Sequence, residues 1–187
     1  MGNSYVNAVV KVKTKLIVSL LEAKKQCNVE DDFLEDDTHL TMLIESARGA
    51  AEDYTGVDLA DTTNTLEFIR LNTDQIKINE ANFDSVTSIT QTIDEVETVI
   101  SSDDYEIQKR RTDFTIMFDS VIDVDKLVIV FKTGFTASNI PTQIKSAILV
   151  KINDLYDMER TSYVSGSNFK DNRTFERLLN ANVVNRW

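Results

Sequence analysis

Cysteine, proline and glycine are scarce in this chain of 187 residues, which has one cysteine, one proline and five glycines. A single cysteine, Cys27, excludes an internal disulfide and a zinc cluster built on cysteines. Few glycines leave little material for a phosphate-cradling loop, and the motifs GxGxxG, GxxxxGK[ST] and GxSxG are absent. The common nucleotide-binding and serine-hydrolase classes therefore have no support, and we predict no catalytic, cofactor-binding or metal-binding residues.

Long hydrophobic runs and a basic excess are missing as well. No apolar segment approaches the roughly 20 residues that a membrane-spanning helix needs, and the N-terminus lacks the apolar core of a secretion signal. Basic residues number 20 against 31 acidic ones, and the net charge of -11 disfavours adsorption to nucleic acid by bulk electrostatics. We therefore expect a soluble protein made in a cytoplasm, with no membrane partner.

The sequence does contain one strong helical pattern, which predicts a central helix over residues 37–55. Acidic residues before it, Asp36 and Asp37, suit a helix N-terminus, and Gly56 suits its end. Gly49 inside the helix suggests a closely packed neighbour. The apolar positions that recur every three or four residues form a predicted core face made of Leu40, Leu43, Ile44, Ala47, Ala51 and Tyr54.

Three further helices are predicted. Ser19 is a suitable N-cap for a short helix over residues 20–27, and Pro141 suits the first turn of a long helix over residues 141–160. A last short helix is expected near the C-terminus. Phe33 and Leu34 interrupt the acidic segment before the central helix and are expected to hold it against the helical core. The long helix contributes predicted core residues Ile144, Ala147, Ile148, Ile152 and Leu155.

Between these helices the period changes to two. Alternation over residues 66–71, 76–78, 105–108, 114–118 and 127–131 predicts about five or six antiparallel strands within residues 64–134. Thr112 and Asp113 lie between two of them, which predicts a hairpin. Residues 1–15 alternate weakly, which fits either a strand added to a neighbour's sheet or a frayed terminus.

The predicted fold class is therefore α+β, with a helical core interrupted by an antiparallel β-rich insertion. We expect one domain, residues 1–187, with an N-terminal extension (1–18), a helical core (19–57 and 138–187) and a β-rich insertion (58–137). The order helices, strands, helices requires the two helical blocks to pack together around one core.

Charged and aromatic residues supply the remaining candidates. Lys109, Arg110 and Arg111 precede the hairpin turn and serve either as a loop contact to DNA or another subunit, or only as a solvated flank. The acidic groups 30–32 and 35–37 lack the spacing of a calcium loop, which favours solvation or helix capping. His39 has no second ligand at metal-binding spacing. The terminal pair Arg186 and Trp187 is either an interface anchor or a disordered tail.

Three blocks of the sequence, kept in order, resemble the head-tail connector (adaptor) family of tailed bacteriophages. The chain departs from the family pattern before Lys15, in its longer β segment and in its ending LLNANVVNRW. The matching positions are Glu22-Ala23-Lys24; Ala47-Arg48, Ala51-Glu52 and Tyr54-Thr55-Gly56; and Pro141, Ile144-Lys145, Ala147-Ile148-Leu149, Leu155-Tyr156 and Arg160.

This resemblance implies a structural virion protein rather than an enzyme. Members of the family assemble in the bacterial host as a ring of about a dozen copies below the portal protein, extend the DNA channel and receive neck or tail proteins. Double-stranded DNA passes without sequence-specific binding. The family's C-terminal segment commonly engages the portal, which makes portal-docking candidates of Phe175, Leu178, Leu179, Val183, Arg186 and Trp187.

Alternatives remain at this point. A non-viral oligomeric adaptor is the main one, and a metal-dependent nuclease built on carboxylates is another. Within the connector interpretation, the acidic body either lines the channel and repels phosphates or only keeps the unassembled subunit soluble.

Overall fold

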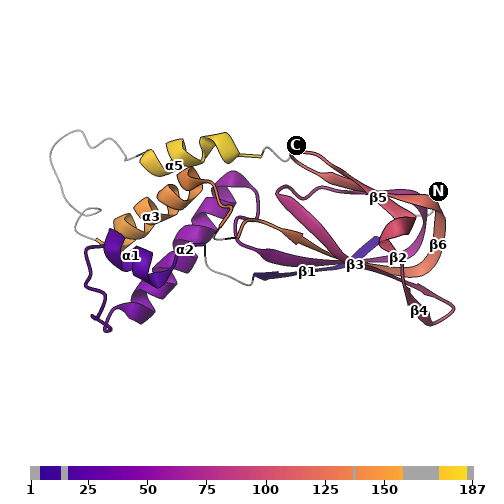
Figure 1. The fold of residues 1–187 in the computed structure, drawn as a ribbon, viewed down its shortest axis with the longest axis horizontal. Coiled ribbons are helices and arrows are strands. Elements are labelled where there is room, and N and C mark those ends of the chain that lie inside the picture. Colours follow the sequence, from indigo (N-terminus) through magenta and orange to yellow (C-terminus); the bar gives the residue numbers. More distant parts are fainter. Residues whose placement is uncertain (1–4, 14–16, 137, 158–172, 185–187) are drawn as a thin grey trace. The chain divides into compact units, whose positions relative to one another are not determined.

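A computed structural model describes residues 5–13, 17–136, 138–157 and 173–184 (Figure 1). The chain forms two compact units. Segments Lys15–Leu59 and Phe135–Trp187 make up the first, which we call the helical unit, and Met1–Thr14 and Ala60–Gly134 make up the second, the sheet unit. The predicted mixture of helices with an antiparallel sheet is confirmed, and helices from both sides of the strand-rich segment belong to one unit.

In the helical unit, α2 packs against α3, and α3 also contacts α1 and α5 (Figure 1). Gly56 ends α2 in the left-handed conformation, with φ of 73°, as predicted. Ser19 caps α1 through a capping box with Glu22, also as predicted. The described elements are α1 (Leu20–Gln26), α2 (Asp37–Thr55), α3 (Thr142–Tyr156), α5 (Thr174–Leu179) and the 3₁₀ turn η2 (Asn180–Asn182).

The predicted helical core is largely buried. Leu43, Tyr54 and Leu155 are only half-buried, so they border the core. Residues 158–160, the end of the predicted long helix, lie outside the described residues. The predicted core residues that the structure buries are Leu40, Ile44, Ala47, Ala51, Ile144, Ala147, Ile148 and Ile152.

The connection from α1 to α2 is held by Lys24 and not by the apolar residues that we predicted. Phe33 is 41% exposed and Leu34 69% exposed, so the prediction that they pin the segment is wrong. Lys24 is buried instead, and its Nζ donates to the main-chain oxygens of Asp31 (3.1 Å) and Phe33 (2.7 Å). Nζ also lies 2.5 Å from Asp37 Oδ1.

Two details of α2 differ from expectation. Asp36 occupies the N-cap, but its side chain accepts no capping hydrogen bond; Asp36 Oδ2 accepts a hydrogen bond from the Tyr156 hydroxyl at 2.5 Å. No neighbouring atom of the described chain would lie within 4 Å of a Cβ added at Gly49. Close packing within the chain therefore does not explain this glycine.

The described strands of the sheet unit form one curled antiparallel sheet of six strands (Figure 1). Its main path runs β1-β2-β6-β3-β4, and β5 pairs with β6. The elements are β1 (Tyr5–Lys13), β2 (Thr62–Ile78), β3 (Phe83–Ile93), β4 (Val96–Val99), the 3₁₀ turn η1 (Ser102–Asp104), β5 (Tyr105–Lys109) and β6 (Phe114–Thr133).

Strands β2 and β6 are each longer than the alternating pattern indicated. Their pairing continues across an irregularity where Thr73 opposes Ile122 but Gln75 already opposes Met117. More residues are used on β6 than on β2, so β6 bends there. Strands β3 and β4 were not identified individually, because β3 is buried at few positions and β4 is exposed throughout.

Aromatic packing closes the curl of the sheet. Phe114 begins β6 and Phe131 lies near its end, yet their ring centroids are 5.1 Å apart. Phe83 stacks on Phe114 at 4.0 Å. Gly134 follows β6 with φ of 89°, where an added Cβ would lie 1.9 Å from the main-chain oxygen of Ala60.

The N-terminal strand pairs within its own chain. β1 lies antiparallel to β2, with Val10 opposite Thr65 and Val12 opposite Thr63. Of the two alternatives left open for residues 1–15, the strand is the one found, but it pairs with the chain's own sheet and not with that of a neighbour. Val10 and Val12 are both exposed.

Candidate functional site

The candidate loop residues Lys109, Arg110 and Arg111 lie at one end of the β5–β6 hairpin. We call these three residues the basic tip. The predicted hairpin is present, since β5 pairs with the start of β6 and the Arg110 N–H donates to the main-chain oxygen of Asp113 at 2.9 Å. All three side chains are exposed. The turn therefore presents three cations to solvent.

Side chains of neighbouring strands contact the residues of the β5–β6 turn. Lys109 Nζ lies 5.6 Å from the centroid of the Phe83 ring, a cation–π contact. Asp113 is buried, and its Oδ2 lies 3.5 Å from Lys77 Nζ. Lys77 therefore adds a fourth cation beside the tip, and the local charge stays positive despite Asp113.

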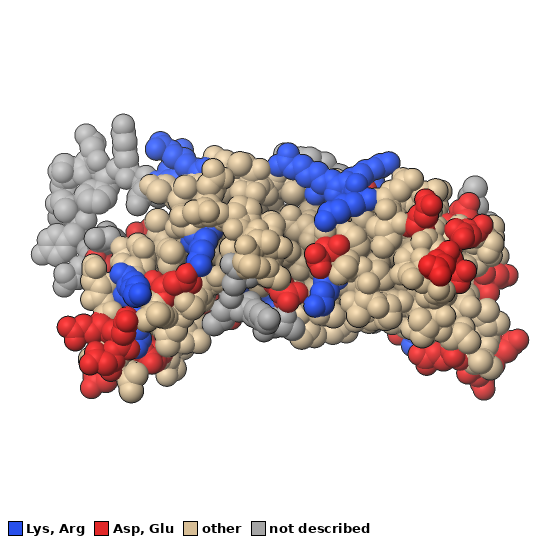
Figure 2. All heavy atoms as spheres, in the orientation of Figure 1, with Lys and Arg blue, Asp and Glu red and all other residues tan. Residues whose placement is uncertain are grey.

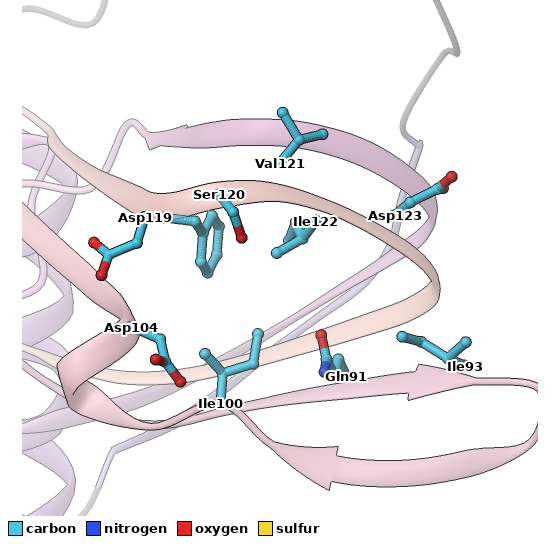
Figure 3. A pocket seen from close by; sticks show the side chains of 10 residues that line it. Gln91, Ile93, Ile100, Asp104, Asp119, Ser120, Val121, Ile122 and Asp123 are labelled. Carbon is cyan, nitrogen blue, oxygen red and sulfur yellow. The ribbon is translucent and has the colours of Figure 1, made fainter.

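The opposite end of the sheet unit is acidic. Figure 2 shows Lys and Arg side chains gathered toward one end of this unit and Asp and Glu side chains at the other. Asp104, Asp119 and Asp123 line a groove there with a volume of about 320 Å³ (Figure 3). We call it the acidic groove. Its other lining residues are Gln91, Ile93, Ile100, Phe118, Ser120, Val121 and Ile122.

Strand pairing explains why the groove is open. Along one edge of β6, residues up to Phe118 pair with β5 and residues from Lys126 onward pair with β3. Residues 119–125 between them have no strand partner on that edge among the described strands. The carboxylates stand beside this gap, and Ile100 and Ile122 point into it (Figure 3).

Sequence reasoning missed the acidic groove. The predicted turn at Thr112 and Asp113 would place Tyr105 opposite Ser120, but in the structure the turn is centred one residue earlier, on Arg111 and Thr112, and Tyr105 lies opposite Phe118. That register places Asp104 next to Asp119 across the hairpin. The contribution of β3 and β4 was not predictable, because these strands carry little alternation.

The C-terminal candidates pack on the chain's own helical unit. Leu179 is fully buried. Phe175 is half-buried, with its ring centroid 6.2 Å from that of Tyr54 and 5.5 Å from Lys151 Nζ. The Tyr54 hydroxyl donates to Asn180 Oδ1 at 2.5 Å. Their role in portal docking stays a prediction, and Leu179 has no exposed surface to offer in this conformation.

Leu178 and Val183 are half-buried, whereas Arg186 and Trp187 lie outside the described residues. The segment is also fixed by its backbone, because the Val184 N–H donates to the main-chain oxygen of Thr55 at 2.8 Å. This bond joins the C-terminal segment to the last turn of α2.

Three titratable groups of the helical unit have shifted pKa values, and in one of them burial raises the pKa of the Cys27 thiol. The hydrogen bond from Lys145, 2.5 Å from Glu22 Oε1, is the main cause that lowers the pKa of Glu22. The hydrogen bond to Asp36 raises the pKa of Tyr156 to about 12, because it favours the protonated hydroxyl. The contacts of Glu22 and Tyr156 each join two helical segments of this unit, α1 to α3 and α3 to the start of α2.

The described residues give no support for a metal site or a membrane-spanning helix. No group of three or more His, Cys, Asp or Glu side chains is arranged there to hold a metal ion. His39 lies next to Tyr156, with ring centroids 6.1 Å apart. None of the helices in the described part of the chain combines the length and hydrophobicity that a membrane crossing requires.

Comparisons with solved structures find the same fold in particle components. The chain is 15% identical to a chain from the neck of an empty GTA particle computed with C6 symmetry, with a TM-score of 0.71 over 95% of this chain and 97% of that chain. A chain from the virion of a native gene transfer agent (GTA) particle is 16% identical, with a TM-score of 0.72 over 96% of both chains.

A third chain, from the neck of a native GTA particle computed with C12 symmetry, is 15% identical, with a TM-score of 0.66 over 95% of this chain and 97% of that chain. Among curated proteins, no sequence matches this one. The family model described as "Phage gp6-like head-tail connector protein" matches residues 17–113, which is more than half of the chain. The chain therefore belongs to the phage gp6-like head-tail connector protein family.

Proposed function

We propose that this protein is a non-enzymatic structural subunit of a virion neck, where copies of it form a ring between head and tail. The observation that carries the proposal is the family match together with a fold shared over 95% of the chain with a neck chain computed with C12 symmetry. Nearly the whole fold is shared, so both units of this chain are expected to serve as one connector subunit.

The finer proposal places the ring below the portal, where it extends the DNA channel and receives neck or tail proteins. Phe175, Leu178 and Val183 are half-buried and keep part of their surface available. Together with Arg186 and Trp187 they make up the proposed portal-facing segment. Its described part is held against α2 at Val184, whose N–H donates to the main-chain oxygen of Thr55. Tryptophan and arginine are residue types that often anchor protein interfaces.

The charge of the chain suits a conduit that lets DNA pass. A net charge of -11 gives little affinity for phosphates, since binding to duplex DNA depends on cations that displace its counterions. Passing DNA would slide along an acidic wall without being held or read. A ring lumen lined mainly by lysine and arginine would contradict this part of the proposal.

Removal of the protein from assembling particles tests the proposed role. We expect particles made without it to accumulate as heads that package DNA but carry no tail and lose their genome, and we expect the wild-type chain supplied in trans to restore tails. Tailed, infectious particles formed in its absence would overturn the proposal. Assembly would take place in the bacterial cytoplasm, so lysates of infected cells are the material to image.

A further inference from the structure

We propose that adjacent copies in the ring join through the sheet unit, with the basic tip of one copy seated in the acidic groove of the next. The inference rests on the proposed ring, and it identifies one contact within that ring. It assigns a partner in the next copy to the basic tip and to the acidic groove.

The groove has the chemistry of a receptor for arginine or lysine side chains. Asp104 and Asp119 lie toward one end of it and Asp123 toward the other, while Ile100 and Ile122 project between them (Figure 3). Carboxylates bind guanidinium and ammonium groups, and an apolar floor suits their aliphatic stems. The volume of about 320 Å³ corresponds to roughly ten water molecules, which is room for one or two long side chains.

The basic tip has the charge and the narrow shape that the acidic groove requires of a ligand. Arg110 lies at the turn, is exposed, and makes no ion pair within the described part of the chain. Lys109 and Arg111 flank it on the same short turn. A turn of this kind is narrow enough to enter a groove that has room for side chains but not for a helix.

The two surfaces lie at opposite ends of one hairpin, so a chain cannot satisfy its own groove. β5 begins beside Asp104 of the groove and ends at Lys109 of the tip. At about 3.3 Å per residue, these ends are roughly 17 Å apart. A ring whose copies contact head to tail needs two different surfaces that complement each other, and the sheet unit carries such a pair.

Other occupants fit the groove less well. A metal ion is disfavoured because the described residues contain no group of three or more ligands placed to hold one. DNA is disfavoured because three carboxylates repel its phosphates. A second copy of this chain brings the required cations in a rigid hairpin, and every copy in a ring would supply both halves of the contact.

Charge reversal tests the pairing in particles made with full-length variants. Lys109→Glu, Arg110→Glu and Arg111→Glu together, or Asp104→Lys, Asp119→Lys and Asp123→Lys together, place like charges against each other. Each triple variant should lower the amount of chain per purified particle at least about tenfold. The variant with all six changes restores opposite charges and should recover most of the loss. Recovery in the variant with all six changes is the decisive result, because if the two triple variants only damaged folding, their combination would lose more protein from the particles.

A cross-link gives a second test. With Cys27→Ser as background, Arg110→Cys and Ser120→Cys in the same chain should form disulfide-linked ladders of subunits in oxidised particles, whereas either cysteine alone should give no ladder. Links to a different protein, or assembled rings without links, would overturn the pairing and leave the proposed function intact. Absence of the wild-type chain from particles would instead refute the proposed function, and the pairing with it.

Discussion

Replacing Lys24 with methionine tests whether one buried ammonium group holds the segment that precedes α2. Methionine keeps most of the side-chain stem but removes the charge and all three donors. The structure predicts that the main-chain oxygens of Asp31 and Phe33 lose a charged donor and that Asp37 loses its cation. Asp37 Oδ1 is buried and makes no hydrogen bond in the described chain beyond this ion pair.

The expected loss follows from these contacts. A hydrogen bond to a charged donor contributes about 1.5–3 kcal/mol, and breaking a buried ion pair costs about 3–5 kcal/mol. The Asp37 side chain is 30% exposed, so water replaces part of the lost contact, and the ammonium group no longer has to be desolvated. We therefore expect Lys24→Met to lower the free energy of unfolding by about 2–4 kcal/mol.

Urea unfolding at pH 7 measures this loss as a fall in the midpoint of about 1 M or more. Lys25→Met is the matched control, because Lys25 is the next residue of α1 and is exposed; it should change stability by less than about 0.5 kcal/mol. Hydrogen exchange in residues 28–36 should speed up only in the Lys24 variant. Equal midpoints for the two variants would refute the reasoning.

Three further predictions concern two glycines and the shifted pKa values of Glu22 and Tyr156. Gly134→Ala should lower the free energy of unfolding by at least about 2 kcal/mol, because φ at Gly134 is positive and the new Cβ would clash with the main-chain oxygen of Ala60. Gly49→Ala should raise it by about 0.5–1 kcal/mol, because alanine is the better helix former and its Cβ has room. Similar melting temperatures for the two variants would contradict this prediction. Glu22→Gln should lose about 1 kcal/mol at pH 7, and because the folded pKa of Glu22 is lowered, the difference should vanish as pH falls through that pKa. A loss that persists at pH 2 would be inconsistent with the ion pair. Because the pKa of Tyr156 is raised to about 12, its hydrogen bond to Asp36 contributes fully to the stability of the fold below pH 10, and this contribution is lost as pH rises toward 12. An ultraviolet titration of the Tyr156→Phe variant should lack the tyrosine ionisation that occurs at the highest pH in the wild-type protein.

Local patterns in the sequence predicted much of the fold. The stripe from Leu40 to Tyr54 and the one from Ile144 to Leu155 each follow the helical period, and most of their members are buried. Ser19 and Gly56 mark helix ends because the chemistry of a cap depends only on neighbouring residues. The hairpin between β5 and β6 was predictable for the same reason.

Features that depend on distant residues were not predictable. A lysine on an amphipathic helix normally faces water, and only the path of the following segment shows that Lys24 is enclosed by carbonyl oxygens. The bend of β6 arises from unequal use of residues on two paired strands, which alternation does not reveal. The acidic groove depends on this bend and on β3, so its aspartates are scattered in the sequence.

The central claim is that copies of this protein form the ring between portal and tail. A cryo-electron microscopy reconstruction of the neck in purified particles tests it most directly. We expect a closed ring of density below the portal into which both the helical unit and the sheet unit of this chain fit, with one copy's hairpin touching the next. A neck reconstructed at side-chain resolution that contains no copy of this chain would contradict the account.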